Sequence, residues 1–190
     1  NVGKELVKNP ARVFIDNLGS IVNSTFPEYS PLITADESSI FFTSRRDNTT
    51  GKKRDPNDLK YYEDVYFSDK VNGEWNAPKN PVKPLNGTKH DATVGLSPDG
   101  QTLLTYKGSN GGDIYQCKLK GDTWSKPEKL PKTINTKDHE SSATFSPDGR
   151  TLYFVSDREG GFGGSDIWMA KKDKKGKWAE PVNLGAAVNS

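Results

Sequence analysis

The stretch that decides the fold is SPDGRTLYFVSDREGGFGGSDIWMAKKDKKGKWAEPVNLGAAVN, residues 146–189. Its apolar residues fall in short runs, 151–155 and 167–170, which have the length of strands rather than helices. The Ser-Pro-Asp-Gly turn at 146–149 suits a hairpin, because proline presets φ, aspartate bonds nearby amides and glycine accepts the left-handed region. The stretch therefore predicts short antiparallel strands joined by tight turns.

The same landmarks recur along the chain. The segment NLGSIVNS at 17–24 returns as NLGAAVNS at 183–190. An asparagine keeps the same phase at Asn23, Asn86, Asn135 and Asn189, which are 63, 49 and 54 residues apart. Three complete repeats therefore fill residues 24–190. Four short strands in each such repeat are typical of a β-propeller blade.

Fixed residues mark the parts of each predicted blade. An aspartate followed by an apolar residue opens one strand, a tryptophan follows 11 or 12 residues later, and an Asp-containing turn joins two strands. These structural repeat positions are Asp64, Asp113, Asp166, Trp75, Trp124, Trp178, Asp99 and Asp148. We predict an all-β fold, a partial β-propeller of about three four-stranded antiparallel blades plus an N-terminal strand.

The repeats divide the chain into four parts. We predict an N-terminal segment at 1–23, whose strand at 11–16 completes another blade, and then blade 1 at 24–86, with an inserted loop at 45–61. Blade 2 covers 87–135 and blade 3 covers 136–190. Closed propellers have roughly four to eight blades, so three blades predict either part of a larger ring or edge-to-edge self-association through exposed sheet edges.

Composition excludes several classes of function. The 190 residues carry 27 Lys and Arg against 25 Asp and Glu, a net charge of +2, which is too balanced for a nucleic-acid-binding face. Cys117 is the single cysteine and there are two histidines, so neither an internal disulfide nor a Cys/His zinc cluster can form. The longest apolar runs are far below the roughly 18 residues of a membrane span, so we expect no transmembrane segment.

The repeat also resembles a known family. The run at 146–189 and HDATVGLSPDGQTLLTYKGSNGGDIY at 90–115 resemble the WD40-like Pro-Asp, or TolB-like, β-propeller repeat. Together with NPARVFIDNLGSIVNS at 9–24, they are similar to the propellers of OmpA-family, PorE-type proteins of the Bacteroidota type IX secretion system. In that family the propeller stands between a tetratricopeptide region and an OmpA-like domain, and this chain departs from the pattern in having only three blades.

The resemblance implies a cellular context. It implies a periplasmic, outer-membrane-associated lipoprotein and a scaffold role, with protein partners in the cell envelope. Peptidoglycan would be bound only through a domain absent from this chain. No cofactor is implied.

Candidate binding residues cluster near the start of each blade's first strand. Alignment on the Asp turns brings Glu28, Asp91 and Glu140 into one register, and His90 and His139 precede two of them. First strands line the channel of a propeller, so we predict a ring of carboxylates at its mouth that attracts a cationic group or a basic peptide. Alternatively, these side chains accept hydrogen bonds from the neighbouring blade or cap a loop.

The inserted loop adds a second candidate surface. It begins at Arg45 and Arg46 and carries Lys52, Lys53 and Arg54 at its centre. We predict that it either docks a partner or is simply a solvated loop.

The residues give little support to catalysis or metal binding. No Gly-x-Ser-x-Gly elbow is present, and one carboxylate per blade at Asp64, Asp113 and Asp166 does not supply the oxygens that calcium needs, so strand-start hydrogen bonding is favoured. The repeated tryptophans are either sugar-stacking platforms or inter-blade packing residues, and packing is favoured. Asp91 and Glu140 could act as an acid/base pair on a glycoside, although their equivalent repeat positions speak against it.

We therefore predict a non-catalytic protein-interaction scaffold without metal or cofactor. The first alternative is a carbohydrate-binding or glycoside-hydrolysing propeller. The second is a propeller appended to a peptidase, which would need a hydrolase domain that this sequence does not contain.

Overall fold

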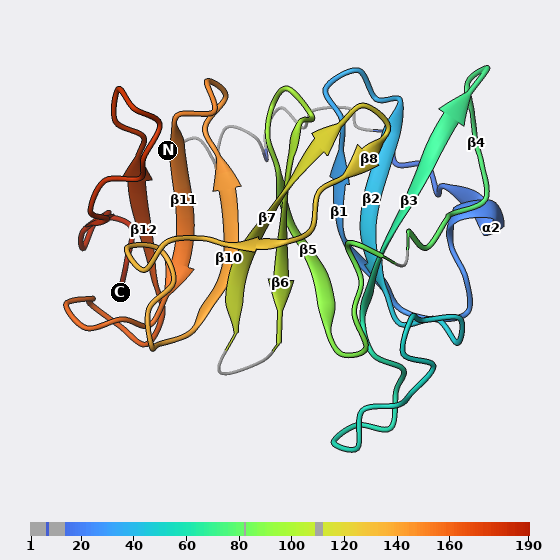
Figure 1. Cartoon of the computed structure of the whole chain (residues 1–190), viewed down its shortest axis with the longest axis horizontal. Helices are drawn as coiled ribbons and strands as arrows, with labels where there is room; N and C mark the ends of the chain where they lie inside the picture. Colours follow the sequence, from blue (N-terminus) through green and yellow to red (C-terminus); the bar gives the residue numbers. More distant parts are fainter. Residues whose placement is uncertain (1–6, 8–13, 82, 109–111) are drawn as a thin grey trace.

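Three antiparallel sheets stand side by side in a curved row (Figure 1). The computed structural model describes residue 7 and residues 14–81, 83–108 and 112–190. Each sheet is one blade and follows chain order, which confirms the predicted all-β class with antiparallel blades. In the part of the chain described, no helix has the length and apolar character needed to cross a membrane.

The strands of the three blades have similar lengths. Blade 1 contains β1 (Glu28–Ile33), β2 (Ser39–Ser44), β3 (Asp64–Val71) and β4 (Glu74–Trp75). Blade 2 contains β5 (Asp91–Leu96), β6 (Thr102–Lys107), β7 (Asp113–Lys120), β8 (Thr123–Trp124) and β9 (Glu128–Lys129). Blade 3 contains β10 (Glu140–Phe145), β11 (Thr151–Ser156), β12 (Asp166–Lys171) and β13 (Val182–Asn183).

The outermost position of each blade is built from two short pieces. In blade 2, β8 and β9 both pair with β7. Blades 1 and 3 show the same division, although in each of them one of the two pieces is a single β-bridge. The bridge joins Phe67 to Lys79 in blade 1 and Lys172 to Trp178 in blade 3. The proline three residues after each tryptophan explains the break, since proline cannot donate to a strand ladder. The fourth strand of each predicted blade is thus divided into two pieces.

The core lies between the blades. One cluster joins Phe41 and Val65 of blade 1 to Leu103 and Cys117 of blade 2. The next joins Leu104 and Ile114 of blade 2 to Leu152, Phe154 and Trp168 of blade 3. Apolar side chains on both faces of the middle strands are needed because a blade between two others is covered on each side.

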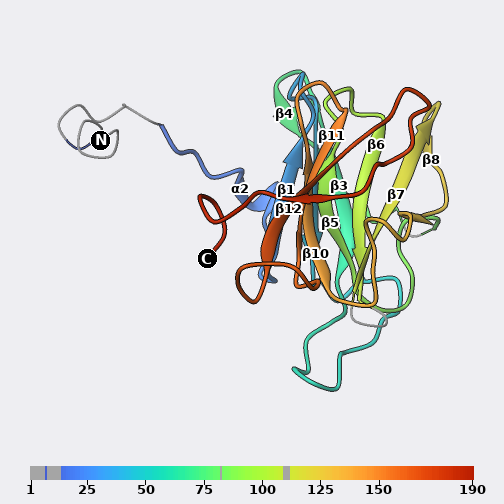
Figure 2. The same ribbon diagram turned by 90° about the vertical axis from the view of Figure 1, so that its left-hand side faces the viewer.

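The N-terminal part leads to the outer side of blade 1. Helix α2 (Gly19–Val22) is followed by Asn23, and Val22 is buried against Phe42 and Tyr66. Figure 2 shows residues 14–18 extending away from the sheets. Of the strand predicted at 11–16, residues 11–13 lie outside the described residues, whereas residues 14–16 carry no strand and are exposed. Their pairing with another blade stays a prediction.

Candidate functional site

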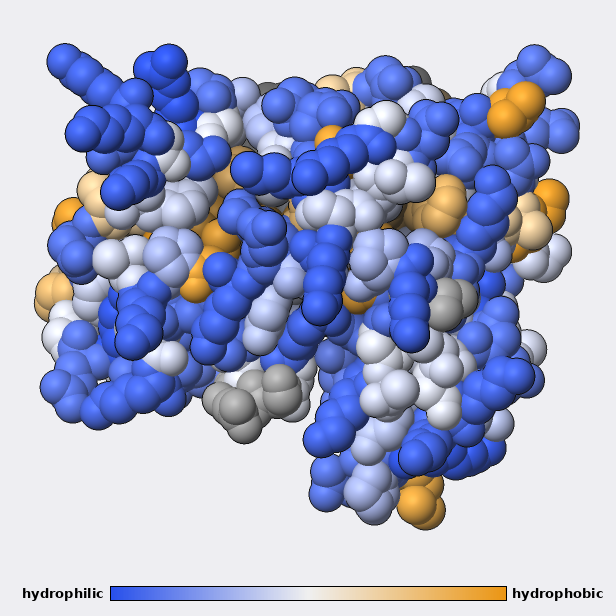
Figure 3. Space-filling view, in the orientation of Figure 1, coloured by the Kyte–Doolittle hydropathy of each residue, from blue (hydrophilic) through white to orange (hydrophobic). Residues whose placement is uncertain are grey.

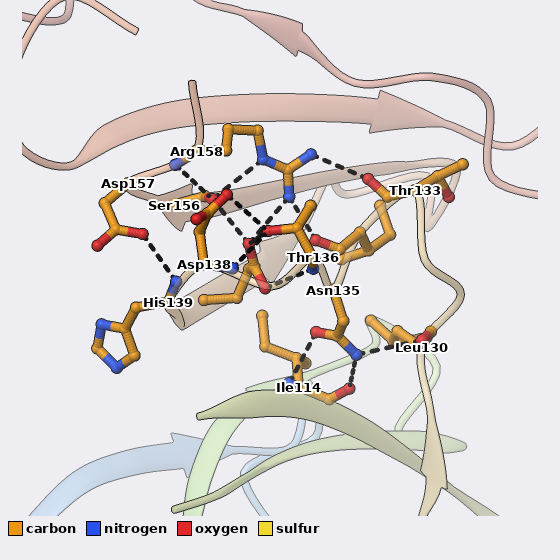
Figure 4. A network of polar contacts seen from close by, with 12 residues as sticks. Ile114, Leu130, Thr133, Asn135, Thr136, Asp138, His139, Ser156, Asp157 and Arg158 are labelled. Carbon is orange, nitrogen blue, oxygen red and sulfur yellow. Dashed lines mark hydrogen bonds and ion pairs between the residues drawn. The ribbon is translucent and has the colours of Figure 1, made fainter. Parts of the chain in front are cut away.

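Of the three carboxylates that open the first strands, Asp91 and Glu140 are buried and Glu28 is partly buried. Glu140 is fully buried and accepts hydrogen bonds from Thr136 N at 2.9 Å, Thr136 Oγ1 at 2.8 Å, Ser156 Oγ at 2.8 Å and Arg158 Nη2 at 3.2 Å. Figure 4 shows the Arg158 guanidinium between Ser156 and Thr133, whose carbonyl it bonds at 3.0 Å. Arg158 also donates to the carbonyl of Ile134. This network ties the end of blade 2 to blade 3.

Glu28 and its partners repeat the arrangement at blade 1. Glu28 accepts from Ser24 and Ser44, and from Arg46, whose Nη2 donates to Val22 O at 2.5 Å. Burial opposes ionisation of Glu28, but the hydrogen bonds from Ser24 and Arg46 outweigh it and lower its pKa.

Asp91 holds the same place in blade 2, with lysine instead of arginine. It accepts from Gly87 N at 2.6 Å and from Lys107, whose Nζ lies 3.1 Å from Leu85 O. Burial raises the pKa of Asp91 more than its pairing with Lys107 lowers it.

These pairings change the interpretation of the predicted carboxylate ring. Glu28, Asp91 and Glu140 do not stand free at the channel mouth, because each is paired with a cation of its own chain. The paired cations also bond carbonyl groups at the end of the preceding blade or N-terminal segment. This arrangement corresponds to the alternative that the carboxylates take part in hydrogen bonding between neighbouring blades. Partner binding by these three and by Arg46 stays a prediction, which their burial disfavours.

Arg45 and His90 hold the inserted loop. Arg45 makes a two-pronged ion pair with Asp58, at 2.5 and 3.0 Å, and its Nε donates to Tyr61 O at 2.5 Å. His90 lies between two carboxylates, with Nδ1 2.7 Å from Glu63 Oε2 and Nε2 2.8 Å from Asp55 Oδ2. The loop, which projects beyond the lower end of the sheets in Figure 1, is therefore fastened at both its base and its middle.

The first strands of all three blades leave regular pairing at the same level. The bulges fall between Tyr29 and Leu32 in β1, between Thr93 and Gly95 in β5, and between Glu140 and Ala143 in β10. Neighbouring first strands contact one another, and residues from all three bulges line one hollow. Bulges turn side chains out of the sheet's regular alternation, and they are frequent beside functional sites.

A groove of about 500 Å³ follows these bulges. It is lined by Ser30, Pro31, Val94, Ser141 and Ser142 and, from outside the bulges, by Glu63, Tyr106 and His139. Tyr106 Oη lies 3.4 Å from His139 Nε2, and the two rings meet edge to face. Burial and the nearby Glu63 carboxylate raise the pKa of Tyr106.

Glu63 joins the groove to the inserted loop. Tyr29 donates its hydroxyl proton to Glu63, and burial together with this bond raises the pKa of Tyr29 strongly. The other Glu63 oxygen faces His90, which contacts Asp55 of the loop. The structure thus brings His90 and His139 to one end of the molecule, where only His139 lines the groove.

The groove residues Glu63 and Tyr106, and Tyr29, which bonds Glu63, were not candidates from the sequence. Glu63 and Tyr106 follow no repeat, because the equivalent positions are occupied by other residue types. Only that departure from the repeat could have marked them.

The repeated aspartates and tryptophans make hydrogen bonds and packing contacts that hold the blades together. Asp64 accepts from Thr50 N at 2.6 Å and Asp166 from Asn183 at 2.8 Å, while Asp113 pairs with Lys129 at 2.8 Å. Trp124 meets Phe41 of the preceding blade edge to face. Trp75 packs beside the cluster under α2, and Trp178 stacks on Phe145 within blade 3. Asp99 and Asp148 accept from a serine hydroxyl in their turns.

The described residues offer no cluster of three or more His, Cys, Asp or Glu side chains that could hold a metal ion. Burial raises the pKa of the Cys117 thiol to about 11, so little of it is nucleophilic thiolate at neutral pH. What the arrangement offers chemically is hydrogen bonding, an aromatic edge and a carboxylate beside an imidazole.

Comparison with known proteins supports the fold. No family model and no curated protein matches the chain. Among solved structures, TolB from Acinetobacter baumannii is 22% identical, over 84% of this chain and 33% of that chain, with a TM-score of 0.52. A puromycin-hydrolyzing peptidase of Mycobacterium tuberculosis is 15% identical, over 85% of this chain and 23% of that one, with a TM-score of 0.51.

A prolyl endopeptidase is 16% identical, over 81% of this chain and 21% of that one, with a TM-score of 0.50. The chain thus spans a third or less of the length of these proteins, and identities this low show the fold alone. The three sheets are blades of a TolB-like β-propeller.

Proposed function

We propose that the chain is a non-catalytic protein-interaction module whose contact surface is the mouth of its channel. The observation that carries the proposal is that the carboxylates at the strand starts are bonded inside the protein, whereas the polar groups of the groove are open to solvent. Glu28, Asp91 and Glu140, which acid–base chemistry would need, are bonded inside the protein. The groove beside them is open, and its polar lining has the character of a binding surface rather than of a proton-transfer site.

The groove fits an extended stretch of polypeptide. Ser141 and Ser142 stand outside the paired register of β10 and line the groove. An extended peptide can bond such residues along its main chain. Tyr106 offers an aromatic surface, and Glu63 and His139 set a preference for charge at one end.

The inserted loop supports the same function. Lys52, Lys53 and Arg54 are exposed, and none of them pairs with a carboxylate within the described part of the chain. Leu59 holds a φ of 60° with 67% of its surface exposed. A leucine in the left-handed region is rare, and such conformations cluster at functional sites. The ion pair of Arg45 keeps this projecting loop ordered before any partner arrives.

The cellular setting rests on the resemblance of the repeat. We place the module in the periplasm, within an outer-membrane-associated complex of the OmpA-like or type IX secretion kind, as part of a lipoprotein with protein partners. The TolB-like fold is compatible with that setting and does not distinguish it from others.

The test uses the purified chain as bait in an extract of the producing cell's envelope. The groove variant combines Tyr106→Ser with His139→Ser, and the loop variant combines Lys52→Glu, Lys53→Glu and Arg54→Glu. A matched control, Lys118→Glu with Lys120→Glu, changes charge near the opposite end of β7. We expect one protein partner to bind the wild type and the control equally, and to be lost by about tenfold or more from the groove variant.

Two outcomes would contradict the proposal. One is that no envelope protein binds at native salt, and the other is that the groove and loop variants bind as the wild type does. A glycan array and a hydrolase assay run in parallel. Glycan binding or hydrolysis that disappears with Tyr106→Ser would replace the proposal by the carbohydrate alternative.

A further inference from the structure

A pocket of about 610 Å³ lies between blades 1 and 2, and none of its described lining residues belongs to the groove at the channel mouth. Blade 1 contributes Phe41 and Phe67 to its walls, and blade 2 contributes Leu119 and Trp124. The Phe41 ring stacks on Phe67, with ring centroids 6.0 Å apart, and meets Trp124 edge to face at 5.7 Å. Figure 3 shows apolar atoms between hydrophilic side chains on this part of the front face, near β8 and β3. Two neighbouring blades thus form a pocket with aromatic walls.

The tryptophan of this pocket lacks the cation that covers its counterparts in the other blades. Each repeated tryptophan pairs with one residue at or just after the end of the third strand, and these pairs are Trp75 with Lys70, Trp124 with Leu119, and Trp178 with Lys172. The Nζ atom of Lys70 lies 5.3 Å from the Trp75 ring centroid, and that of Lys172 lies 4.7 Å from the Trp178 ring centroid. In blade 2 the partner is a leucine, and no lysine or arginine among the described residues lies over the tryptophan.

The charges around the pocket also differ from those of the equivalent pocket between blades 2 and 3. That second pocket is lined by Lys118, Lys172 and Lys177, and its described lining contains no carboxylate. The pocket between blades 1 and 2 has Asp69 at the strand position of Lys118, and Asp122 is added to its lining. Asp122 forms no ion pair within the part of the chain that the structure describes. Two carboxylates beside aromatic walls favour a positively charged ligand.

Lys79 shows that one side of the pocket accepts an ammonium group. Its Nζ atom lies 3.6 Å from Asp69 Oδ2 and 5.5 Å from the ring centroid of Phe67. The Lys79 side chain is 63% exposed, so water screens this ion pair and only a small free energy holds it. Neither Lys79 nor Lys83, the other lysine of the described lining, forms an ion pair with Asp122. Asp122 and the aromatic wall of blade 2 therefore remain for a cation from outside.

We propose that the pocket between blades 1 and 2 binds an organic cation, an alkylammonium or guanidinium group, beside Trp124 and the carboxylates of Asp69 and Asp122. The cation takes the place that a lysine fills over the tryptophans of blades 1 and 3. It is attracted by the indole ring and by the carboxylates at once, and a pocket that partly excludes water strengthens both attractions. A lysine or arginine side chain of another polypeptide and a free polyamine carry this same group. The proposal goes beyond the proposed function, because the site lies apart from the groove.

The test follows binding through the indole N–H signal of Trp124 in NMR spectra, which the variant Trp124→Phe identifies. The probes are acetyl-arginine methylamide, spermidine and acetyl-citrulline methylamide, whose urea group has the shape of guanidinium without its charge. We expect both cations to shift the signal to saturation and to bind at least about fivefold more tightly than the citrulline probe. Their affinity should fall when the salt concentration is raised about tenfold. Tighter binding of spermidine indicates a free polyamine as the source of the cation, and tighter binding of the arginine probe indicates a side chain; both results support the proposal.

Substitutions in the pocket sharpen the test. Leu119→Lys gives blade 2 the lysine that blades 1 and 3 carry at this position, so the fold accommodates it and the new ammonium fills the site. We expect the affinity for the arginine probe to fall about tenfold or more, whereas Leu119→Met, which adds no charge, should change it by less than about twofold. Asp122→Asn should weaken binding by about threefold or more. Asp173→Asn, in the corresponding hairpin of blade 3, is its matched control and should leave binding unchanged.

Several results would overturn the proposal. One is that neither cation shifts the Trp124 signal to saturation. Another is equal binding of the arginine and citrulline probes, because the pocket would then not select a charge. Unchanged binding in Leu119→Lys would show that the cation does not lie beside the indole ring. The groove variant, Tyr106→Ser with His139→Ser, should bind the probes as the wild type does, and a loss of binding there would place the cation in the groove instead.

Discussion

At the scale of single residues, the repeated asparagine acts as a clamp between the end of a blade and its third strand. Asn135 Oδ1 accepts from Ile114 N at 2.9 Å, and its Nδ2 donates to Ile114 O at 2.8 Å. Asn86 and Asn189 make the same pair of bonds to their own third strands. The amide is suited to this place because it offers a donor and an acceptor side by side, which satisfies both buried backbone groups at once.

The clamp predicts a large effect from one small substitution. Asn135→Ala leaves the buried N–H of Ile114 unsatisfied, at about 1–3 kcal/mol, and removes one of the two hydrogen bonds of the Ile114 C=O, which still accepts from Leu130 N. We expect the free energy of unfolding, measured with urea, to fall by about 2–4 kcal/mol. Asn23→Ala is the matched control: Asn23 bonds Asn17 at 2.9 Å but contacts no third strand in the described chain, so we expect its loss to be below about 1 kcal/mol. Equal losses would contradict the clamp.

At the scale of elements, the hairpin turns are stabilised by their aspartates. Asp36 accepts from Thr34 Oγ1 at 2.6 Å and from Ser38 N at 3.1 Å, and these bonds lower its pKa to about 2. The pKa values of Asp99 and Asp148 are lowered in the same way, first by the hydrogen bond from the equivalent serine hydroxyl and then by the bond from the backbone amide two residues later. The hydroxyl and amide donors favour the charged form in the folded chain alone.

The turns therefore predict a pH dependence with a definite sign. In the unfolded chain an aspartate has a pKa of about 3.9, so the hydrogen bonds of the turns stabilise the folded state fully above that pH. That stabilisation fades as the pH falls toward the lower folded pKa of each aspartate. Carboxyl chemical shifts followed by NMR should show it. Ser146→Ala should raise the pKa of Asp148 toward the free value and leave that of Asp99 unchanged, whereas a parallel shift of both would contradict a local cause.

The inserted loop is an element held by Arg45 and, through Asp55 and Glu63, by His90. We expect His90→Ala to release the middle of the loop, because Asp55 and Glu63 lose their common partner. Trypsin should then cleave after Lys52, Lys53 or Arg54 about tenfold faster than in the wild type. His139→Ala is the matched control, since His139 holds the same repeat position without a loop to fasten. Equal cleavage rates in the two variants would show that His90 does not hold the loop.

At the scale of the whole molecule, stability resides in the interfaces between blades. Each blade is a thin sheet whose middle strands are covered only when blades stand on both sides, as the buried Leu103 and Leu104 of blade 2 show. Blade 2 is therefore the most protected, and blades 1 and 3 each carry one terminal face. Opening of an interface should then be local rather than global.

Cys117 reports on the opening of one interface. It is fully buried between blades 1 and 2, and its pKa, raised to about 11 by burial, makes the thiol slow to react. We expect Leu85→Ala to speed its labelling by a thiol reagent, because Leu85 is fully buried in the same cluster between these blades and its loss opens a cavity there. Leu152→Ala, which removes the same kind of contact between blades 2 and 3, should speed it much less. Equal acceleration would show that the molecule opens as a single unit.

The sequence by itself determined the number of blades, their turns and the place of the repeated Asp and Asn. These features depend on short-range patterns that recur in every repeat. The short apolar runs, the turn residues and the regular spacing of the repeated asparagine are therefore enough to find them. The division of the outermost strand has a local cause as well, because Pro78, Pro127 and Pro181 cannot donate to the strand ladder.

Only the tertiary structure decided the states of the polar residues. The carboxylate of Glu140 is paired inside the protein because Arg158, 18 residues later and two residues past the end of β11, turns back onto it. The groove combines Glu63, Tyr106 and His139 from three separate parts of the chain, which the curvature of the row brings together. Burial and pairing are properties of what lies across an interface, and no local pattern of residues contains that information.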